Sequence, residues 1–319
     1  MAIRLDGAVL AMFPGQGSQR RGMAAALCAD HPEAAAVFAT ADATLGLPIT
    51  ELCTTGDEAD LRRTELTQPA VVATSLAIWN VLQANDFEPD MVAGHSLGEF
   101  AALAAAGVLT YEQALRLVAR RGELMAEVAQ RVPGAMLAVI GLSAETVEQL
   151  CDRVVGADVA NYNEPEQTVV SGTVTALAEI ERTAGEAGAH KCVWLEVGAP
   201  FHSSLMDAIA AEFGAELDRH RFADPRLPVL SSVTAAPVRT GAEAEQLLRR
   251  QLSGGVQWVA VVRTAIAEGC TTLLEVGPGR ALTGFAKRIA PELAVFGTGT
   301  TKSLDAVVAA LATSRSTAA

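Results

Sequence analysis

The sequence predicts an α/β protein with two domains: a large α/β-hydrolase-like domain built on a parallel sheet, and a small ferredoxin-like α+β domain inserted into it. Short apolar runs alternate with longer Ala- and Leu-rich segments, which is typical of buried parallel strands joined by helices. The pattern changes between about Pro133 and Val197, where the expected elements follow a ferredoxin-like order. A chain of 319 residues is also long enough for two folding units.

The strands of the large domain are expected where an apolar run ends in glycine or a polar turn. These runs are Ala8 to Phe13, Met91 to Ala93, Leu227 to Val233 and Leu273 to Val276. Apolar runs without alternation fit strands that are covered on both faces. We therefore assign residues 1–132 and 198–319 to the large domain and residues 133–197 to the insertion.

Within the insertion the predicted order is strand, helix, strand, strand, helix, strand. The strands are expected at Met136 to Ile140, Asp158 to Tyr162, Thr168 to Ser171 and Lys191 to Val197, and the helices at Ser143 to Arg153 and Thr173 to Ala187. Ser143 is suited to cap the first helix, and Gly188 to end the second.

The composition bounds the function. Half of the residues are apolar, 19% are charged and the net charge is −13, so we expect a globular protein with no nucleic-acid partner. No apolar run approaches the ~20 residues that span a bilayer, and the N-terminal run is too short for a signal peptide, so we expect a cytoplasmic protein without membrane contact. The five cysteines form no C-x-x-C pair or Cys/His cluster, so no metal site is expected.

Gly94-His95-Ser96-Leu97-Gly98 is a candidate nucleophile turn. It follows a short apolar strand and precedes a helix-like run. A serine on such a turn needs small neighbours and presents its hydroxyl. The N–H of Leu97, at the helix start, would point toward the oxygen of a bound acyl group. On local grounds, glycines that only shape a turn remain an alternative.

A serine nucleophile needs a base, and His202 is the leading candidate among five histidines. It follows the last strand of the insertion, where the chain re-enters the large domain and loops line clefts. His95 adjoins the serine but is expected to point elsewhere, His31 and His220 lie in polar helical segments, and His190 begins a strand. Spacing alone leaves a buried structural histidine as an equal alternative for His202.

A second glycine-rich turn, residues 13–19 (Phe-Pro-Gly-Gln-Gly-Ser-Gln), follows the first expected strand. It lacks the Lys-Ser/Thr of a P-loop and the third glycine of a dinucleotide-binding turn. It is suited to present a backbone N–H as the other half of an oxyanion hole. A tight turn with no ligand is equally compatible with the local sequence.

Together these motifs resemble those of malonyl-CoA:acyl-carrier-protein transacylases of fatty-acid synthesis and the related acyltransferases of polyketide synthases. The matching segments occur in the family's order and span roughly residues 8 to 290. They are Phe-Pro-Gly-Gln-Gly-Ser-Gln (13–19), Thr-Gln-Pro-Ala (67–70), Gly-His-Ser-Leu-Gly-Glu (94–99), Arg-Gly-Glu-Leu-Met (121–125), Asn-Glu-Pro-Glu-Gln-Thr-Val-Val-Ser-Gly (163–172), Ala-Pro-Phe-His-Ser-Ser-Leu-Met (199–206), Val-Gln-Trp (256–258) and Glu-Val-Gly-Pro-Gly (275–279).

The resemblance implies a Ser-His dyad, with Ser96 as the acyl-carrying nucleophile and His202 as its general base. In the family a backbone carbonyl orients the imidazole, which here falls near Gln257, and no third carboxylate is required. The resemblance also assigns the oxyanion hole to the backbone N–H groups of Gln16 and Leu97.

Arg121 corresponds to the family's arginine that clamps the carboxylate of the malonyl group. A planar guanidinium can donate two charge-assisted hydrogen bonds to a carboxylate and would reject an uncharged acyl chain. Its neighbour Arg120 is expected to be a solvated helix residue. Phe201 resembles the malonyl-type pattern, since it fills the space that an extra methyl would need, and Asn163 and Gln257 are expected at the substrate site.

The resemblance therefore implies a ping-pong acyltransferase that moves malonyl from coenzyme A to the phosphopantetheine thiol of an acyl carrier protein, in fatty-acid or polyketide biosynthesis. No bound cofactor is expected, because coenzyme A is a substrate and phosphopantetheine belongs to the carrier. Carrier proteins are usually acidic, so we expect a local basic patch near the cleft, drawing on Lys191, Arg280, Lys287 and Arg288. We expect a monomer.

Other functions fit part of the sequence. A serine thioesterase or esterase also uses a G-x-S-x-G turn, but such enzymes place Asp or Glu between serine and histidine and have no use for Arg121. An acyltransferase of the same family that is selective for another acyl group is a second alternative. A dead scaffold that docks carrier proteins is disfavoured by the presence of Ser96, His202 and Arg121. The motifs do not separate fatty-acid, polyketide and malonate-decarboxylase pathways.

Overall fold

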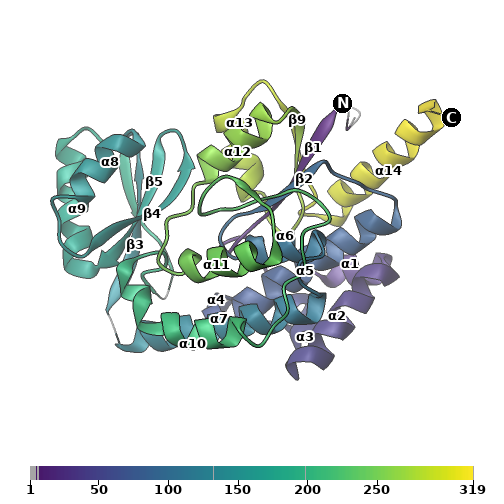
Figure 1. Ribbon diagram of the computed structural model, residues 1–319, viewed down its shortest axis with the longest axis horizontal. Coiled ribbons are helices and arrows are strands. Elements are labelled where there is room, and N and C mark those ends of the chain that lie inside the picture. The colour runs from purple at the N-terminus through teal and green to yellow at the C-terminus, as the bar shows by residue number, and fades with distance from the viewer. Residues whose placement is uncertain (1–4, 6, 132, 198, 319) are drawn as a thin grey trace.

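The computed structural model describes residues 5, 7–131, 133–197 and 199–318. Within these residues, six strands form a large sheet in the order β10-β9-β1-β2-β7-β8 (Figure 1). Neighbouring strands run parallel, except that β7 and β8 are antiparallel. The strands are β1 (Ala8–Phe13), β2 (Met91–Gly94), β7 (Val229–Leu230), β8 (Pro237–Val238), β9 (Cys270–Glu275) and β10 (Ala294–Gly297).

The apolar runs of the sequence become the buried strands of this sheet, which confirms the predicted α/β class. Every residue of β1 after Ala8 is buried, as expected for a strand covered on both faces. Of the predicted run Leu227 to Val233, only two residues pair as β7, because the chain turns back at Ser231 to run antiparallel as β8. The sequence did not predict β8 or β10, which are short and lie at the two edges.

Helix α5 (Thr64–Ala84) lies at the centre of the helical layer and is buried on nearly all sides. Small and apolar side chains surround it, which is typical of a helix enclosed by others. It packs against α2 (Pro32–Leu45), α6 (Gly98–Ala105) and α7 (Tyr111–Arg131). The other helices around the large sheet are α1 (Ala25–Asp30), α3 (Ile49–Thr54), α4 (Glu58–Arg62), α10 (Ala210–Leu217), α11 (Gly241–Gln251), α12 (Trp258–Ala267), α13 (Ala281–Ile289) and α14 (Thr301–Ala318).

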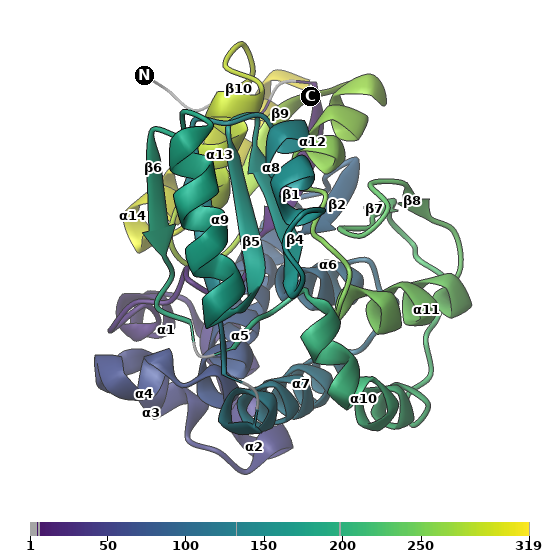
Figure 2. The ribbon, with the colours of Figure 1, turned by 90° about the vertical axis from the view of Figure 1, so that its left-hand side faces the viewer.

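The second sheet is antiparallel and has the strand order β4-β5-β3-β6. Helices α8 and α9 cover its outer face (Figure 2), and the Ser143 and Thr173 side chains cap them. This arrangement confirms the predicted ferredoxin-like unit. Its elements are β3 (Gly134–Ile140), α8 (Ala144–Cys151), β4 (Ala157–Glu164), β5 (Gln167–Thr173), α9 (Val174–Glu186) and β6 (Lys191–Trp194).

The inner face of the small sheet packs on the elements around the large sheet, and β4 contacts α12 and α13. Met136, Ala138 and Val169 belong to the same apolar cluster as the helices of the large sheet. Strand β4 also forms a parallel bridge to Val256, whose N–H and carbonyl bond the small sheet at 2.8 and 2.9 Å. We propose that residues 133–197 form the inserted domain; residues 132 and 198, at its predicted ends, lie outside the described residues.

Among the helices of the described residues, none combines the length and the apolar character needed to cross a membrane.

Candidate active site

Ser96 lies on the tight turn between β2 and α6, and the sequence around it explains the turn. Its φ is +50°, a left-handed conformation that costs energy for a residue with a side chain. A Cβ on Gly94 would lie 2.0 Å from the Gly98 carbonyl carbon, and one on Gly98 would lie 2.0 Å from the Phe13 carbonyl oxygen. Glycine is therefore required at both positions, and the turn holds the Ser96 hydroxyl in place.

His202 lies opposite Ser96, with its Nε2 2.6 Å from the serine Oγ. It comes from the loop between β6 and a short 3-10 helix, η1 (Ser204–Ile209), and it too has a left-handed φ, +59°. The structure thus brings together two residues that are 106 positions apart. The loop is fixed to the small sheet, because the N–H and hydroxyl of Ser204 both bond Asp158 Oδ2, at 2.9 and 2.8 Å.

Two backbone carbonyls orient the imidazole. His202 Nδ1 lies 2.8 Å from the Gln251 carbonyl oxygen and 3.0 Å from that of Gly254. Since a carbonyl only accepts, Nδ1 carries the proton and Nε2 presents its lone pair to Ser96. The sequence placed this carbonyl near Gln257; that position is corrected, because the chain turns at the end of α11 and presents residues 251 and 254 instead.

Burial keeps the imidazole neutral. Burial, together with the nearby Arg121 charge, lowers the pKa of His202 from the ordinary 6.5 to about 3, despite the opposing bond to the Gln251 carbonyl. A neutral imidazole at neutral pH is able to take a proton from a serine hydroxyl.

The turn before α6 and the glycine-rich turn after β1 supply unpaired donors. Within the described residues, the backbone N–H groups of Gln16 and Leu97 have no protein acceptor. The Gln16 side chain is held by Thr64, whose hydroxyl donates to it at 2.9 Å. Both N–H groups are therefore available to a substrate oxygen.

Arg121 approaches Ser96 from α7. Its Nη2 lies 3.3 Å from Ser96 Oγ, and its Nη1 donates to the Gln68 side chain at 2.9 Å. The side chain is buried, and among the described residues no carboxylate forms an ion pair with it. Its Nε has no acceptor, and burial lowers its pKa to about 10 although Glu99 opposes the shift. The geometry leaves a buried cation beside the nucleophile with donors to spare.

A pocket of about 190 Å³ opens over the dyad and is lined by residues of the small sheet, of the turns after β1 and β2, of the His202 loop and of α13. Phe201 and Asn163 both line it, and their predicted role in substrate binding stays a prediction. The His95 ring also lines it, and its Nε2 bonds Asn163 Oδ1 at 2.8 Å rather than the serine. Gln257 does not line this pocket; it borders a separate cavity with Tyr162.

The residues predicted to form a basic patch lie in two places. Arg280, Lys287 and Arg288 are exposed at or on α13, a helix that also lines the pocket. Arg288 bonds Glu164 of the small sheet at 2.9 Å. Lys191 is exposed at the start of β6, whose other end leads to the His202 loop. None of the four lines the pocket, but Arg280 directly precedes Ala281, which does, and Lys287 and Arg288 lie on the same helix.

Sequence reasoning missed two side chains of this site. Gln251 and Glu99 are buried and bond each other at 2.6 Å, and Gln251 also contacts Arg121 and Ser96. Glu99 falls in a motif that the sequence already marked, whereas Gln251 lies in none. Within the described residues, no group of three or more His, Cys, Asp or Glu is arranged to hold a metal ion.

Comparison with known proteins agrees with this geometry. Residues 11–291 match the family described as "Acyl transferase domain", and the chain belongs to that family. Malonyl CoA-acyl carrier protein transacylase of Bacillus subtilis is 39% identical over 282 residues, covering 87% of this chain and 89% of the relative. The enzyme of the same name from Escherichia coli is 38% identical over 286 residues, covering 88% and 93%.

Solved structures extend the similarity to the fold. An acyl carrier protein S-malonyltransferase from Vibrio cholerae has a TM-score of 0.90 and 38% identity, covering 94% of this chain and 99% of that one. A malonyl-transacylase in complex with its type II PKS acyl-carrier protein has a TM-score of 0.91 and 37% identity, covering 96% and 99%.

Proposed function

We propose that this protein is a malonyl-CoA:acyl-carrier-protein S-malonyltransferase that works through an ester on Ser96. The observation that carries the proposal is a buried arginine without a carboxylate partner, 3.3 Å from a serine oxygen that already faces a neutral imidazole. The dyad alone fits any acyl transfer from a thioester. Arg121 adds the preference for an acyl group that carries its own carboxylate.

In the first half-reaction, His202 Nε2 takes the Ser96 proton as the hydroxyl attacks the thioester carbonyl. The carbonyl oxygen becomes an oxyanion between the Gln16 and Leu97 N–H groups, an interaction worth about 2.7–4 kcal/mol for each donor. Coenzyme A leaves as its thiol with the proton from His202, and the malonyl group remains on Ser96.

The acyl group then sits on the atom that Arg121 contacts. This position brings the malonyl carboxylate within reach of a guanidinium whose Nε has no acceptor among the described residues. Phe201, in the wall of a pocket of about 190 Å³, favours an unbranched short chain. Selectivity for malonyl over methylmalonyl follows from this wall.

In the second half-reaction, the phosphopantetheine thiol of a carrier protein attacks the ester, with His202 again taking the proton. Water competes with the thiol for the ester. The pocket must therefore admit the pantetheine arm and keep water from hydrolysing the ester. Reaction with a thioester and then with a thiol needs no bound cofactor, and we propose a monomeric, cytoplasmic enzyme that uses none.

We propose that the exposed cations of α13 contact the carrier protein. The chain carries a net charge of −13, so an acidic carrier requires a local surface of opposite sign. Arg280 directly precedes Ala281, which lines the pocket, and Lys287 lies on the same helix, so these exposed cations meet this requirement. Reversing both charges is expected to raise the KM for the carrier protein and to leave acylation by malonyl-CoA unchanged.

A serine hydrolase is the competing function. Two features disfavour it: His202 Nδ1 faces carbonyl oxygens instead of a carboxylate, and a general hydrolase has no use for Arg121. Initial rates with varied malonyl-CoA and varied holo carrier protein decide between them. Parallel double-reciprocal lines and malonyl-carrier product are expected; free malonate as the main product would contradict the proposal.

A further inference from the structure

Gln251, the last residue of α11, connects four parts of the active site although no motif marks it. Its Nε2 donates to Glu99 Oε2 at 2.6 Å and to the Ser96 carbonyl at 3.1 Å. Its Oε1 accepts from Arg121 Nη2 at 3.3 Å, and its own carbonyl accepts from His202. The side chain is almost completely buried.

The neighbours fix the direction of the amide. A carboxylate and a carbonyl only accept, whereas a guanidinium only donates. The NH₂ group must therefore face Glu99 and Ser96, and the oxygen must face Arg121. If the amide were flipped, its NH₂ group would face the donor Arg121, and its oxygen would face the acceptors Glu99 and Ser96.

Glu99 is the carboxylate that Arg121 would be expected to pair with, because buried cations are normally compensated by a direct partner. Its oxygens instead accept from the Ser232 hydroxyl at 2.5 Å, from the Ser232 N–H at 3.3 Å and from Gln251. The Glu99 carboxyl group, whose pKa is raised by burial, lies one amide away from the guanidinium. Among the described residues, the guanidinium donates only to neutral oxygens, those of Gln68, Ser96 and Gln251.

We propose that Gln251 is a specificity-determining positioning residue, whose amide separates the Glu99 carboxylate from Arg121 and holds the guanidinium beside Ser96 with its charge free for the substrate. This inference rests on the proposed function, since it assumes that Arg121 binds an acyl carboxylate. A carboxylate in direct contact with Arg121 would occupy the donors that the acyl group needs and would cancel the charge that selects it.

The test moves the carboxylate from residue 99 to residue 251. The double variant Glu99→Gln/Gln251→Glu keeps one acid and one amide but places the acid on Arg121. Glu99→Gln removes the acid alone. Glu275→Gln is the matched control, because Glu275 is also buried and accepts from the backbone N–H groups of Leu282 and Thr283 on α13 instead of contacting the dyad or Arg121. The readouts are the rates at which malonyl-CoA and acetyl-CoA acylate Ser96, and the hydrolysis of p-nitrophenyl acetate, a neutral ester that reports dyad chemistry.

In the double variant the ratio of malonyl to acetyl acylation is expected to fall about 10- to 100-fold, the range for one lost hydrogen bond to a charged group. Hydrolysis of the neutral ester is expected to fall much less. Glu99→Gln and Glu275→Gln are expected to keep malonyl strongly preferred. If the double variant does not fold, Gln251→Met replaces it. Its ratio of malonyl to acetyl acylation is also expected to fall, because Arg121 loses the Gln251 oxygen that holds it.

A wild-type ratio in the double variant, or an equal loss with all three reagents, would overturn the inference, since both outcomes make Gln251 merely structural. The proposed function fails in a different way: wild type itself would show no preference for malonyl over acetyl.

Discussion

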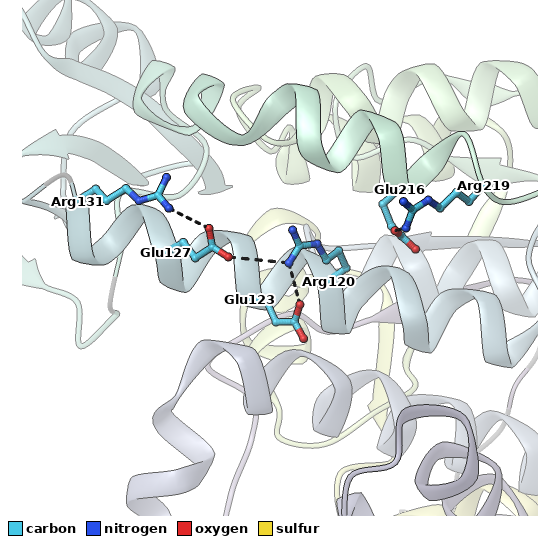
Figure 3. A network of polar contacts seen from close by, with 6 residues as sticks. All are labelled: Arg120, Glu123, Glu127, Arg131, Glu216 and Arg219. Carbon is cyan, nitrogen blue, oxygen red and sulfur yellow. Dashed lines mark hydrogen bonds and ion pairs between the residues drawn. The ribbon is translucent and has the colours of Figure 1, made fainter.

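Arg120 and Arg121 are neighbours on α7 but lie in opposite environments. Arg120 is partly exposed and lies 3.0 Å from Glu123 and 3.9 Å from Glu127, which in turn lies 3.3 Å from Arg131. Figure 3 shows this row of alternating charges along the outer face of the helix. Arg121 is buried and contacts only neutral acceptors.

The difference shows how the same side chain serves two purposes one residue apart. An exposed pair gains little, because water screens the charges and the side chains lose freedom. A buried cation without an ionic partner is costly. The presence of one beside the nucleophile therefore indicates that an anionic ligand pairs with it. One face of α7 therefore carries surface ion pairs, and another face carries an active-site arginine.

The largest expected effect comes from removing the Ser96 hydroxyl, which Arg121 contacts and Arg120 does not. Ser96→Ala should lower acylation by malonyl-CoA at least about 1000-fold, because in the part of the chain that the structure describes no other nucleophile bonds His202 Nε2. Quenched-flow acylation with circular dichroism as the folding control checks it. Acylation that persists in this variant would assign the nucleophile elsewhere.

The second effect compares the two arginines directly. Arg121→Ala should lower malonyl acylation about 100-fold, through loss of a bidentate, charge-assisted contact, and should leave acetyl acylation much less affected. Arg120→Ala should change either rate less than about twofold. Equal losses in both variants would remove the distinction between the two faces of α7.

A third effect concerns pH. The Arg121 charge contributes to the lowered pKa of His202, second to burial, so wild-type acylation should stay constant as pH falls from 7 to about 5. In Arg121→Gln, measured with acetyl-CoA, the pKa should rise part of the way toward 6.5 and the acid limb should move to higher pH. Arg120→Gln should not move it.

The same shift has a consequence for stability. Because the folded pKa of His202 lies below its ordinary value, the unfolded chain binds the extra proton first. The stability that this histidine contributes is present above about pH 6.5 and is lost as pH falls from 6.5 toward 3. Unfolding by urea at several pH values in wild type and His202→Gln checks the sign.

The smallest effect is expected at Arg120, on the solvent side of α7. Arg120→Ala should change the free energy of unfolding by less than about 1 kcal/mol, with the difference shrinking as salt is added. Urea unfolding at low and high ionic strength measures it. A loss of several kcal/mol would mean that the exposed row carries part of the fold's stability.

Sequence reasoning predicted the parts of the fold that local patterns determine. Buried runs such as Ala8–Phe13 and the cap Ser143 carry their own signals, and each appears as expected or nearly so. The edge strands β8 and β10 are two and four residues long, too short for a pattern, and they form only because a neighbouring strand offers its edge.

For the site, motifs identified the residues but not the contacts between them. Ser96, His202 and Arg121 lie in segments with strong local constraints, and the structure places them together. Gln251 escaped because an amide at the end of an ordinary helix has no sequence signal; its importance comes from what surrounds it. The carbonyl of the same residue was misplaced near Gln257 for the same reason, since a backbone acceptor can belong to any residue type.

Intact-mass measurement after brief incubation with malonyl-CoA or acetyl-CoA tests the central claim most directly. A malonyl adduct on wild type that far exceeds the acetyl adduct, disappears in Ser96→Ala and falls sharply in Arg121→Ala is expected. Equal malonyl and acetyl adducts on wild type, or an adduct indifferent to Arg121→Ala, would contradict the account of a serine acyltransferase selected by a buried arginine.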